Sequence, residues 1–208
     1  IKTIIDDGID PATVMFLINA TYFKGIWRTR FDKKETRDAE FRAEDGTTGT
    51  VALMTLEDTL PYTETDLYQA VDLPYGAGAF SMTVVLPREG HTLKEVTESL
   101  SSGGWETLAA ALRKRSGRVY LPRFRLEWEK VLNTTLQGMG MVDAFVPGTA
   151  DFTGLSDLAM ELGLFVSEVK QKTYVDVDEE GTEAAAVTSV AVGVTSMHDE
   201  FFFRADRP

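Results

Sequence analysis

The side chains best suited to chemistry do not form a catalytic pattern in this sequence. The chain has two histidines, His91 and His198, and no cysteine. Neither histidine stands near a serine and an aspartate in a pattern typical of a hydrolase, and the nucleophile sequence G-x-S-x-G is absent. Without cysteine, thiol nucleophiles, disulfides and zinc–thiolate sites are excluded. We therefore expect no catalytic residues and no enzyme activity, and we interpret both histidines as exposed loop residues.

One acidic segment imitates a calcium-binding loop. Residues 176–181 read D-V-D-E-E-G, with carboxylates and a glycine where such a loop begins. The position that needs a bidentate glutamate is Val187, and a run of small and β-branched residues follows in place of a helix. The G-x-G pairs at 76–78 and 138–140 lack the third glycine of a dinucleotide loop and indicate turns. We expect no metal site and no cofactor.

The net charge limits the partners. At −12 over 208 residues, the chain would repel nucleic acid and anionic lipid, so neither is an expected partner. No run of 18 apolar residues is present, so no membrane-spanning helix is expected. A basic cluster, Arg113, Lys114, Arg115 and Arg118, is better interpreted as the solvated end of a helix than as a polyanion site.

The least ordinary stretch runs from Asp178 to Ser196. It begins as an acidic turn around Gly181 and continues without Lys or Arg as a small, then β-branched, sequence. Read at a period of two, one face carries no charge, which suits a strand inside a sheet. The small residues of its first half equally suit an exposed loop. Composition alone leaves open a loop that can become a strand, a linker, and an ordinary buried strand.

Two strands stand out as candidates to position this stretch. Val14–Phe23 is almost continuously apolar, which predicts a strand buried on both faces in the middle of a sheet. Asn19 lies inside it and would need hydrogen-bond partners. Phe165–Asp178 alternates as a long strand and leads directly into the stretch.

The remaining elements predict one α+β domain with more sheet than helix. Asp45-Gly46 indicates a hairpin, and strands at 60–63, 67–73 and 80–86 predict an antiparallel meander. Helices are expected at 92–100, 105–115 and 129–139, and the end of another at 1–9. Further strands are expected at 118–127, with a local break at Pro122, and at 201–203.

Several motifs at consistent spacing resemble one family. They are N-A-T-Y-F-K-G-I-W at 19–27, L-P-R-F at 121–124, A-D-F-T-G at 150–154, E-E-G-T-E-A-A-A at 179–186 and F-R-A-D-R-P at 203–208. The chain resembles the serpins, protease inhibitors that insert a reactive loop into a sheet. The likeness covers nearly the whole chain and is to the inhibitory, prokaryote-like type.

The resemblance implies a fold. That fold is α+β, with a large, mostly antiparallel central sheet, smaller sheets, short helices and a mobile reactive-centre loop. Residues 1–208 would be part of a single serpin domain, without its N-terminal helical region and its last C-terminal core strands. The resemblance leaves open a secreted or a cytoplasmic location.

The resemblance also assigns roles to residues. The inhibitory hinge would be Glu179, Glu180, Gly181, Thr182, Glu183, Ala184, Ala185 and Ala186. Counting from Glu179 by the family's spacing places the reactive bond at Thr195–Ser196, with Val194 or Met197 as alternatives if it shifts. Support at the insertion site would come from Trp27, Arg123, Asn19 and Gln171. Gln171 stands where the family usually has a histidine that pairs with the buried asparagine, and an amide can also bond Asn19. Arg123 is expected to pair with Glu179.

The implied function is suicide inhibition of serine proteases by a monomeric protein. A small Thr195 suits elastase- or subtilisin-like proteases, and cleavage near Met197 would suit chymotrypsin-like ones. After cleavage the hinge would insert as a new strand between the two strands described above. The alternative is a non-inhibitory serpin that acts as a chaperone or carrier.

Overall fold

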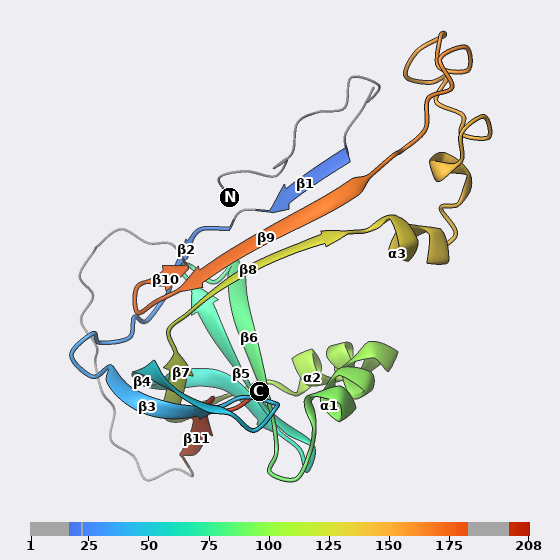
Figure 1. Ribbon diagram of the computed structural model, residues 1–208. Coiled ribbons are helices and arrows are strands. Elements are labelled where there is room, and N and C mark those ends of the chain that lie inside the picture. Colours follow the sequence, from blue (N-terminus) through green and yellow to red (C-terminus); the bar gives the residue numbers. More distant parts are fainter. Residues whose placement is uncertain (1–16, 22, 183–199) are drawn as a thin grey trace. The chain divides into compact units, whose positions relative to one another are not determined.

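The computed structural model describes residues 17–21, 23–182 and 200–208 (Figure 1). The helix end expected at 1–9, the hinge beyond Thr182 and the reactive bond lie outside these residues. The described residues form two compact units. One contains those before Phe23 together with Arg125–Val175, and the other contains Phe23–Phe124 together with those from Asp176 onward.

The first unit is built on three paired strands. They are β1 (Leu17–Thr21), β8 (Phe124–Val131) and β9 (Val169–Val177), and β1 and β8 each pair with β9. The pairing of β1 with β9 is parallel, from Leu17 opposite Val169 to Thr21 opposite Thr173. A short helix, α3 (Asn133–Gly138), and the 3-10 turn Asp143–Phe145 follow β8.

The strand predicted at 14–23 is present over Leu17–Thr21, and its place in the middle of a sheet and its burial on both faces stay predictions. Among the described residues β1 has one strand neighbour, β9, and stands at one end of the path β1-β9-β10-β2. Asn19 is accordingly exposed. Continuous apolar sequence identified the strand, but the number of its neighbours is set by the rest of the fold.

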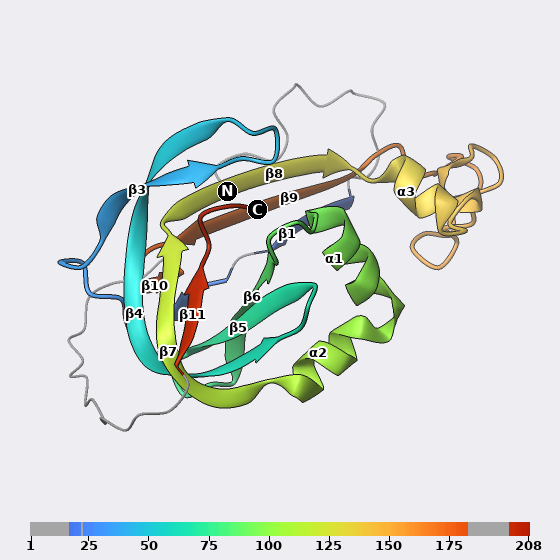
Figure 2. The same cartoon turned by 90° about the horizontal axis from the view of Figure 1, so that it is seen from below.

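The second unit contains a six-stranded sheet (Figure 2). Its strands pair in the order β11-β7-β4-β5-β6, and β3 also pairs with β4. Their bounds are β3 (Arg37–Arg42), β4 (Thr48–Glu64), β5 (Tyr68–Tyr75), β6 (Phe80–Pro87), β7 (Arg113–Pro122) and β11 (Phe201–Arg204). The hairpin at Asp45-Gly46 and the meander through β6 are confirmed.

Two helices pack against this sheet. They are α1 (Leu93–Ser99) and α2 (Trp105–Ala111), joined by the π-helical turn Leu100–Gly104. Thr92 and Glu95 form a capping box that starts α1. Val96 and Leu108 are buried against Tyr68 and Ala70 of β5, so one apolar position from each helix fixes the pair to the sheet.

Three expected elements have different bounds. The helix expected over 105–115 ends at Ala111, because Leu112 is extended and the basic residues that follow pair with β4 as β7. The basic cluster is therefore on a strand and not at a helix end. The helix expected over 129–139 is limited to α3, because residues 129–131 complete β8. The strand expected at 60–63 is the end of the longer β4.

Candidate functional site

The hinge begins inside a sheet. Gly181–Thr182 form the short strand β10, which pairs antiparallel with β2 (Gly25–Ile26) and, through Thr182, with Val177 of β9. Both residues of β10 are buried. We call residues 178–182 the hinge turn. Its strand β10 lies between β2 and the end of β9.

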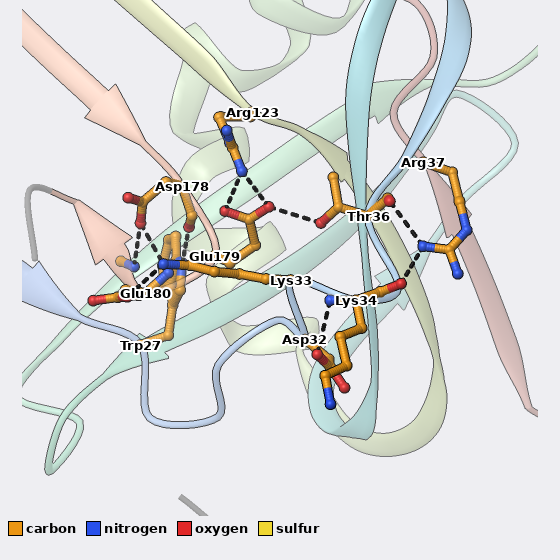
Figure 3. Close-up of polar contacts among 11 residues, drawn as sticks. Trp27, Asp32, Lys33, Lys34, Thr36, Arg37, Arg123, Asp178, Glu179 and Glu180 are labelled. Atoms are coloured by element: carbon orange, nitrogen blue, oxygen red, sulfur yellow. Dashed lines mark hydrogen bonds and ion pairs between the residues drawn. The ribbon is translucent and has the colours of Figure 1, made fainter. Parts of the chain in front are cut away.

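Glu179 is the buried anchor of the hinge turn. Its side chain is only 1% exposed. Arg123 donates through Nη2 to both carboxylate oxygens at 2.6 and 2.7 Å, and the Thr36 hydroxyl donates to Oε1 at 2.7 Å (Figure 3). The expected pairing of Arg123 with Glu179 is present. Because these donors satisfy both buried oxygens, the carboxylate is held as the anion.

The pKa of Glu179 reflects two opposing effects, burial and hydrogen bonding. Burial by itself raises the pKa of the carboxyl, because the charged form loses hydration. The hydrogen bonds from Thr36 and Arg123 outweigh burial, and the pKa of Glu179 lies below its ordinary value. The same pair raises the pKa of Arg123.

The chain from Trp27 onward wraps the hinge turn with backbone hydrogen bonds. The amides of Trp27 and Phe31 donate to the carbonyls of Glu180 and Glu179, each at 3.0 Å. The Trp27 indole donates through Nε1 to the carbonyl of Asp178 at 2.9 Å, and Lys33 pairs with Glu180 at 2.6 Å (Figure 3). Trp27 is thus a buried support of the turn.

Asp178 closes the turn from within. Its Oδ1 accepts from the backbone amides of Glu180 at 2.8 Å and Gly181 at 3.2 Å. This is the local hydrogen-bonding pattern that favours aspartate at turns. The acidic sequence that imitates a calcium loop therefore forms a hydrogen-bonded turn. Within the part of the chain that the structure describes, no group of three or more His, Cys, Asp or Glu side chains is placed to hold a metal.

Glycine is required at both faces of the β10–β2 contact. A Cβ on Gly181 would lie 2.1 Å from the carbonyl oxygen of Gly25, and its φ of +151° is unfavourable for other residues. A Cβ on Gly25 would lie 2.6 Å from the ring of Tyr75. The two backbones approach so closely that side chains do not fit between them.

Thr182 ends the described part of the hinge with its side chain turned inward. It is 5% exposed, and its hydroxyl lies 2.8 Å from the hydroxyl of Tyr75, which is 7% exposed. Burial raises the pKa of Tyr75, and either hydroxyl can donate to the other. Trp27 stacks on the Tyr75 ring at 4.3 Å.

Asn19 and Gln171 belong to the other unit. The parallel register places Asn19 of β1 directly opposite Gln171 of β9. The sequence expectation that these two residues face each other is consistent with this register. The backbone register alone does not establish their side-chain bond, so that bond stays a prediction.

The other residues predicted for the hinge and the reactive bond lie outside the described residues, as does His198. They are Glu183, Ala184, Ala185, Ala186, Thr195 and Ser196. His91 is exposed, 3.7 Å from Glu95, in keeping with the loop interpretation. Within the described ranges, the structure has no helix both long and apolar enough to cross a membrane.

Sequence reasoning missed Thr36, Lys33 and Tyr75, which all contact the hinge turn. They are 143, 147 and 107 residues away from their partners along the chain. Neither Thr36 nor Lys33 lies in a distinctive motif. Tyr75 follows a proline and precedes a glycine, a pattern that indicates only a turn.

Comparison with known proteins identifies the family. The model for "Serpin (serine protease inhibitor)" matches residues 1–208. The chain belongs to the serpin family. Human Serpin B11 is 37% identical over 96% of this chain and 51% of its own length. Intracellular coagulation inhibitor 2 of Tachypleus tridentatus is 38% identical over 100% of the chain and 51% of its own length.

A solved serpin structure supports the fold. The thermophilic serpin tengpin in its native state superposes with a TM-score of 0.85 at 33% identity, covering all of this chain and 53% of that one. The α+β serpin fold expected from the motifs is thus confirmed. The chain spans about half the length of the curated relatives it matches.

Proposed function

We propose that the full-length protein containing this chain inhibits a serine protease as a suicide substrate. The protease attacks the reactive loop after Thr195 and forms an acyl-enzyme. The freed hinge then inserts between β1 and β9 as a new strand, and the protease is trapped before it can hydrolyse the ester.

The observation that carries this proposal is the position of β10. Gly181 and Thr182 already pair with β2 and with the end of β9. β10 is antiparallel to β9, which is the direction a loop strand would need to run between the parallel strands β1 and β9. A loop continuing from Thr182 would therefore enter the sheet in register with a strand that has already begun.

The sequence beyond Thr182 supports insertion energetically. Val190, Val192 and Val194 share one face of the loop at a period of two. Burying a valine-sized side chain contributes about 1.5–3 kcal/mol, so this face alone supplies a driving force. Ala184 and Ala186 on the same face offer no bulk to obstruct entry. These small residues also count against the carrier alternative, whose loop would have no need to enter a sheet.

The direct test is to mix the full-length protein with elastase-, subtilisin- and chymotrypsin-like proteases. A covalent complex that survives denaturing electrophoresis with at least one of them is expected. The mass of the released C-terminal fragment identifies the bond, and a new N-terminus at Ser196 is the expected result. Cleavage of the loop by all three proteases without any complex would refute inhibition and favour the non-inhibitory alternative.

A substitution at the start of the hinge tests the insertion step. Thr182 is buried, so Thr182→Arg would place a large charged side chain in a buried position and stall insertion. We expect this variant to be cleaved at the same bond but to release active protease. Glu183→Arg changes the neighbouring residue, which lies on the opposite face of the alternating sequence, and serves as the control. A Thr182→Arg variant that still traps protease would show that insertion is not the mechanism.

A further inference from the structure

We propose that Tyr75 is a positioning residue that seats Thr182 in the sheet before the loop is cleaved, and that this seat favours trapping over release of the protease. The second part rests on the proposed function; the first part does not. Tyr75 lies outside every motif that carries the family resemblance. Its assignment comes from the geometry of the hinge turn.

The contact between the two hydroxyls is buried and specific. Tyr75 and Thr182 are 7% and 5% exposed, and their oxygens are 2.8 Å apart. A buried hydroxyl without a partner is costly, so Thr182 can stay inside the sheet only if its hydroxyl is satisfied there. Tyr75 is the side-chain partner that the structure provides for it.

Tyr75 itself is held in place on several sides. Its ring stacks on Trp27 with an interplanar angle of 14° and meets Phe23 edge-on at 4.8 Å. On either side of it the backbone is bonded to the same segment. The Arg28 amide donates to the Pro74 carbonyl, and the Gly76 amide donates to the Ile26 carbonyl, both at 2.8 Å. The hydroxyl is therefore presented at a fixed point, as a positioning residue requires.

A seated Thr182 removes the unfavourable first step of strand formation. Starting a strand fixes backbone before many hydrogen bonds are gained, whereas extending a strand adds bonds for each residue ordered. With Thr182 already paired to Val177 and Gly25, the freed loop only has to extend. Because hydrolysis of the acyl-enzyme competes with insertion, faster insertion traps a larger fraction of the protease.

The seat is tested first in the uncleaved full-length protein, by hydrogen exchange of a peptide that covers residues 178–186. Losing one buried hydroxyl contact should speed exchange there about five-fold, in Tyr75→Phe and equally in Thr182→Val. The double variant should exchange no faster than either single one, because both remove the same contact. Thr182→Ser, which keeps the hydroxyl, should restore slow exchange. Tyr68→Phe is the matched control, since Tyr68 is a buried tyrosine on the same strand that packs against α1 and α2.

The second test measures how many inhibitor molecules are consumed per protease trapped. We expect this ratio to rise about two- to five-fold for Tyr75→Phe, while the rate of the first encounter with protease stays within two-fold. A merely destabilised fold would instead lower the thermal midpoint and alter both quantities.

The outcomes separate the two proposals. Unchanged exchange in both Tyr75→Phe and Thr182→Val would overturn the seat, whether or not the protein inhibits. Faster exchange with an unchanged ratio would retain the seat and refute its effect on trapping. If the wild-type protein traps no protease, the proposed function fails, and the exchange measurement still decides whether Tyr75 seats Thr182. Should Tyr75→Phe not fold, Thr182→Val gives the same readout.

Discussion

At the scale of single residues, the hinge turn depends on one buried carboxylate. Glu179 accepts from Arg123 and Thr36 and is 1% exposed. Arg123 is 48% exposed, so solvent screens the ion pair, which contributes at most about 1 kcal/mol by itself. The larger effect is the cost of leaving two buried oxygens and their donors badly matched. The ion pair with Arg123 thus contributes little by itself, and the hydrogen bonds to its buried oxygens make Glu179 difficult to replace.

We predict that Glu179→Gln destabilises the protein by about 1–3 kcal/mol, because the amide offers one acceptor where two are used. A thermal midpoint several degrees below that of wild type at pH 7 is expected. Glu89→Gln, which changes an exposed glutamate in the same unit, is the control and should leave the midpoint unchanged. Equal midpoints for both variants would show that the buried contacts of Glu179 contribute nothing to stability.

The pH dependence of this effect has a definite sign. The pKa of Glu179 is lowered from its ordinary value of 4.5 in the folded protein, so its contribution to stability is complete above that value. As the pH falls from there through the lower folded pKa, the carboxylate takes up a proton and the contribution is lost. The gap between wild type and Glu179→Gln should therefore be constant from pH 6 to 8 and narrow below pH 4.5. Midpoints measured across this range check it, and a gap that widens in acid would contradict the assignment.

At the scale of elements, the sequence predicted which strands exist better than where they end. The polar pair Glu57-Asp58 hides the continuity of β4, which runs on to Glu64. Both residues pair across to β7, where Glu57 meets Arg118 at 2.6 Å. The same cross-strand pairing explains why the basic residues after Ala111 form a strand and not the end of a helix. The composition of one segment does not reveal the charges on the strand that pairs with it. Tertiary pairing therefore overrides a prediction made from local sequence.

The residues of the candidate site likewise divide into those with a local sequence signal and those placed by long-range contacts. The hinge turn, Trp27 and Arg123 are each part of a dense local motif and were found from the sequence. Thr36, directly before β3, and Tyr75, the last residue of β5, reach the hinge turn only through the tertiary fold. A residue whose role depends on one long-range contact leaves no local signal.

One element-scale prediction concerns the contact of β2 with β10. Gly25→Ala would put a Cβ 2.6 Å from the Tyr75 ring and 2.8 Å from the Phe23 ring, and Tyr75 is fixed by its stacking on Trp27. Overpacking of this kind costs about 1–3 kcal/mol. We expect a lower thermal midpoint together with faster hydrogen exchange in the hinge turn.

Gly49→Ala is the matched control for this variant. Gly49 lies on β4, and nothing stands within 4 Å of the Cβ that would be added. Its midpoint should stay close to that of wild type or rise slightly, because alanine restricts the unfolded chain. Equal midpoints for Gly25→Ala and Gly49→Ala would show that the close contact of Gly25 with the Tyr75 and Phe23 rings does not require glycine.

At the scale of the whole molecule, the proposed mechanism requires that the intact protein is not in its most stable state. In that mechanism the loop before cleavage would leave Val190, Val192 and Val194 without the sheet that their spacing suits. Inserting them would stabilise the molecule by about 5–9 kcal/mol in gross apolar burial, part of which is lost to ordering the loop. A net gain of a few kcal/mol corresponds to a rise of several degrees in the thermal midpoint of a protein of this size or larger.

We therefore predict that cleavage between Thr195 and Ser196 raises the thermal midpoint of the full-length protein by several degrees. The measurement compares intact and cleaved protein by scanning calorimetry after the protease has been removed. Cleaved Thr182→Arg is the control. It carries the same broken bond, but a charge at the buried entry position should keep the loop out, so its midpoint should not rise. A wild-type midpoint that stays level or falls on cleavage would show that no strand is added. An equal rise in both proteins would mean that the stabilisation does not depend on inserting the side chain at position 182. That result would contradict a loop that inserts from Thr182 onward.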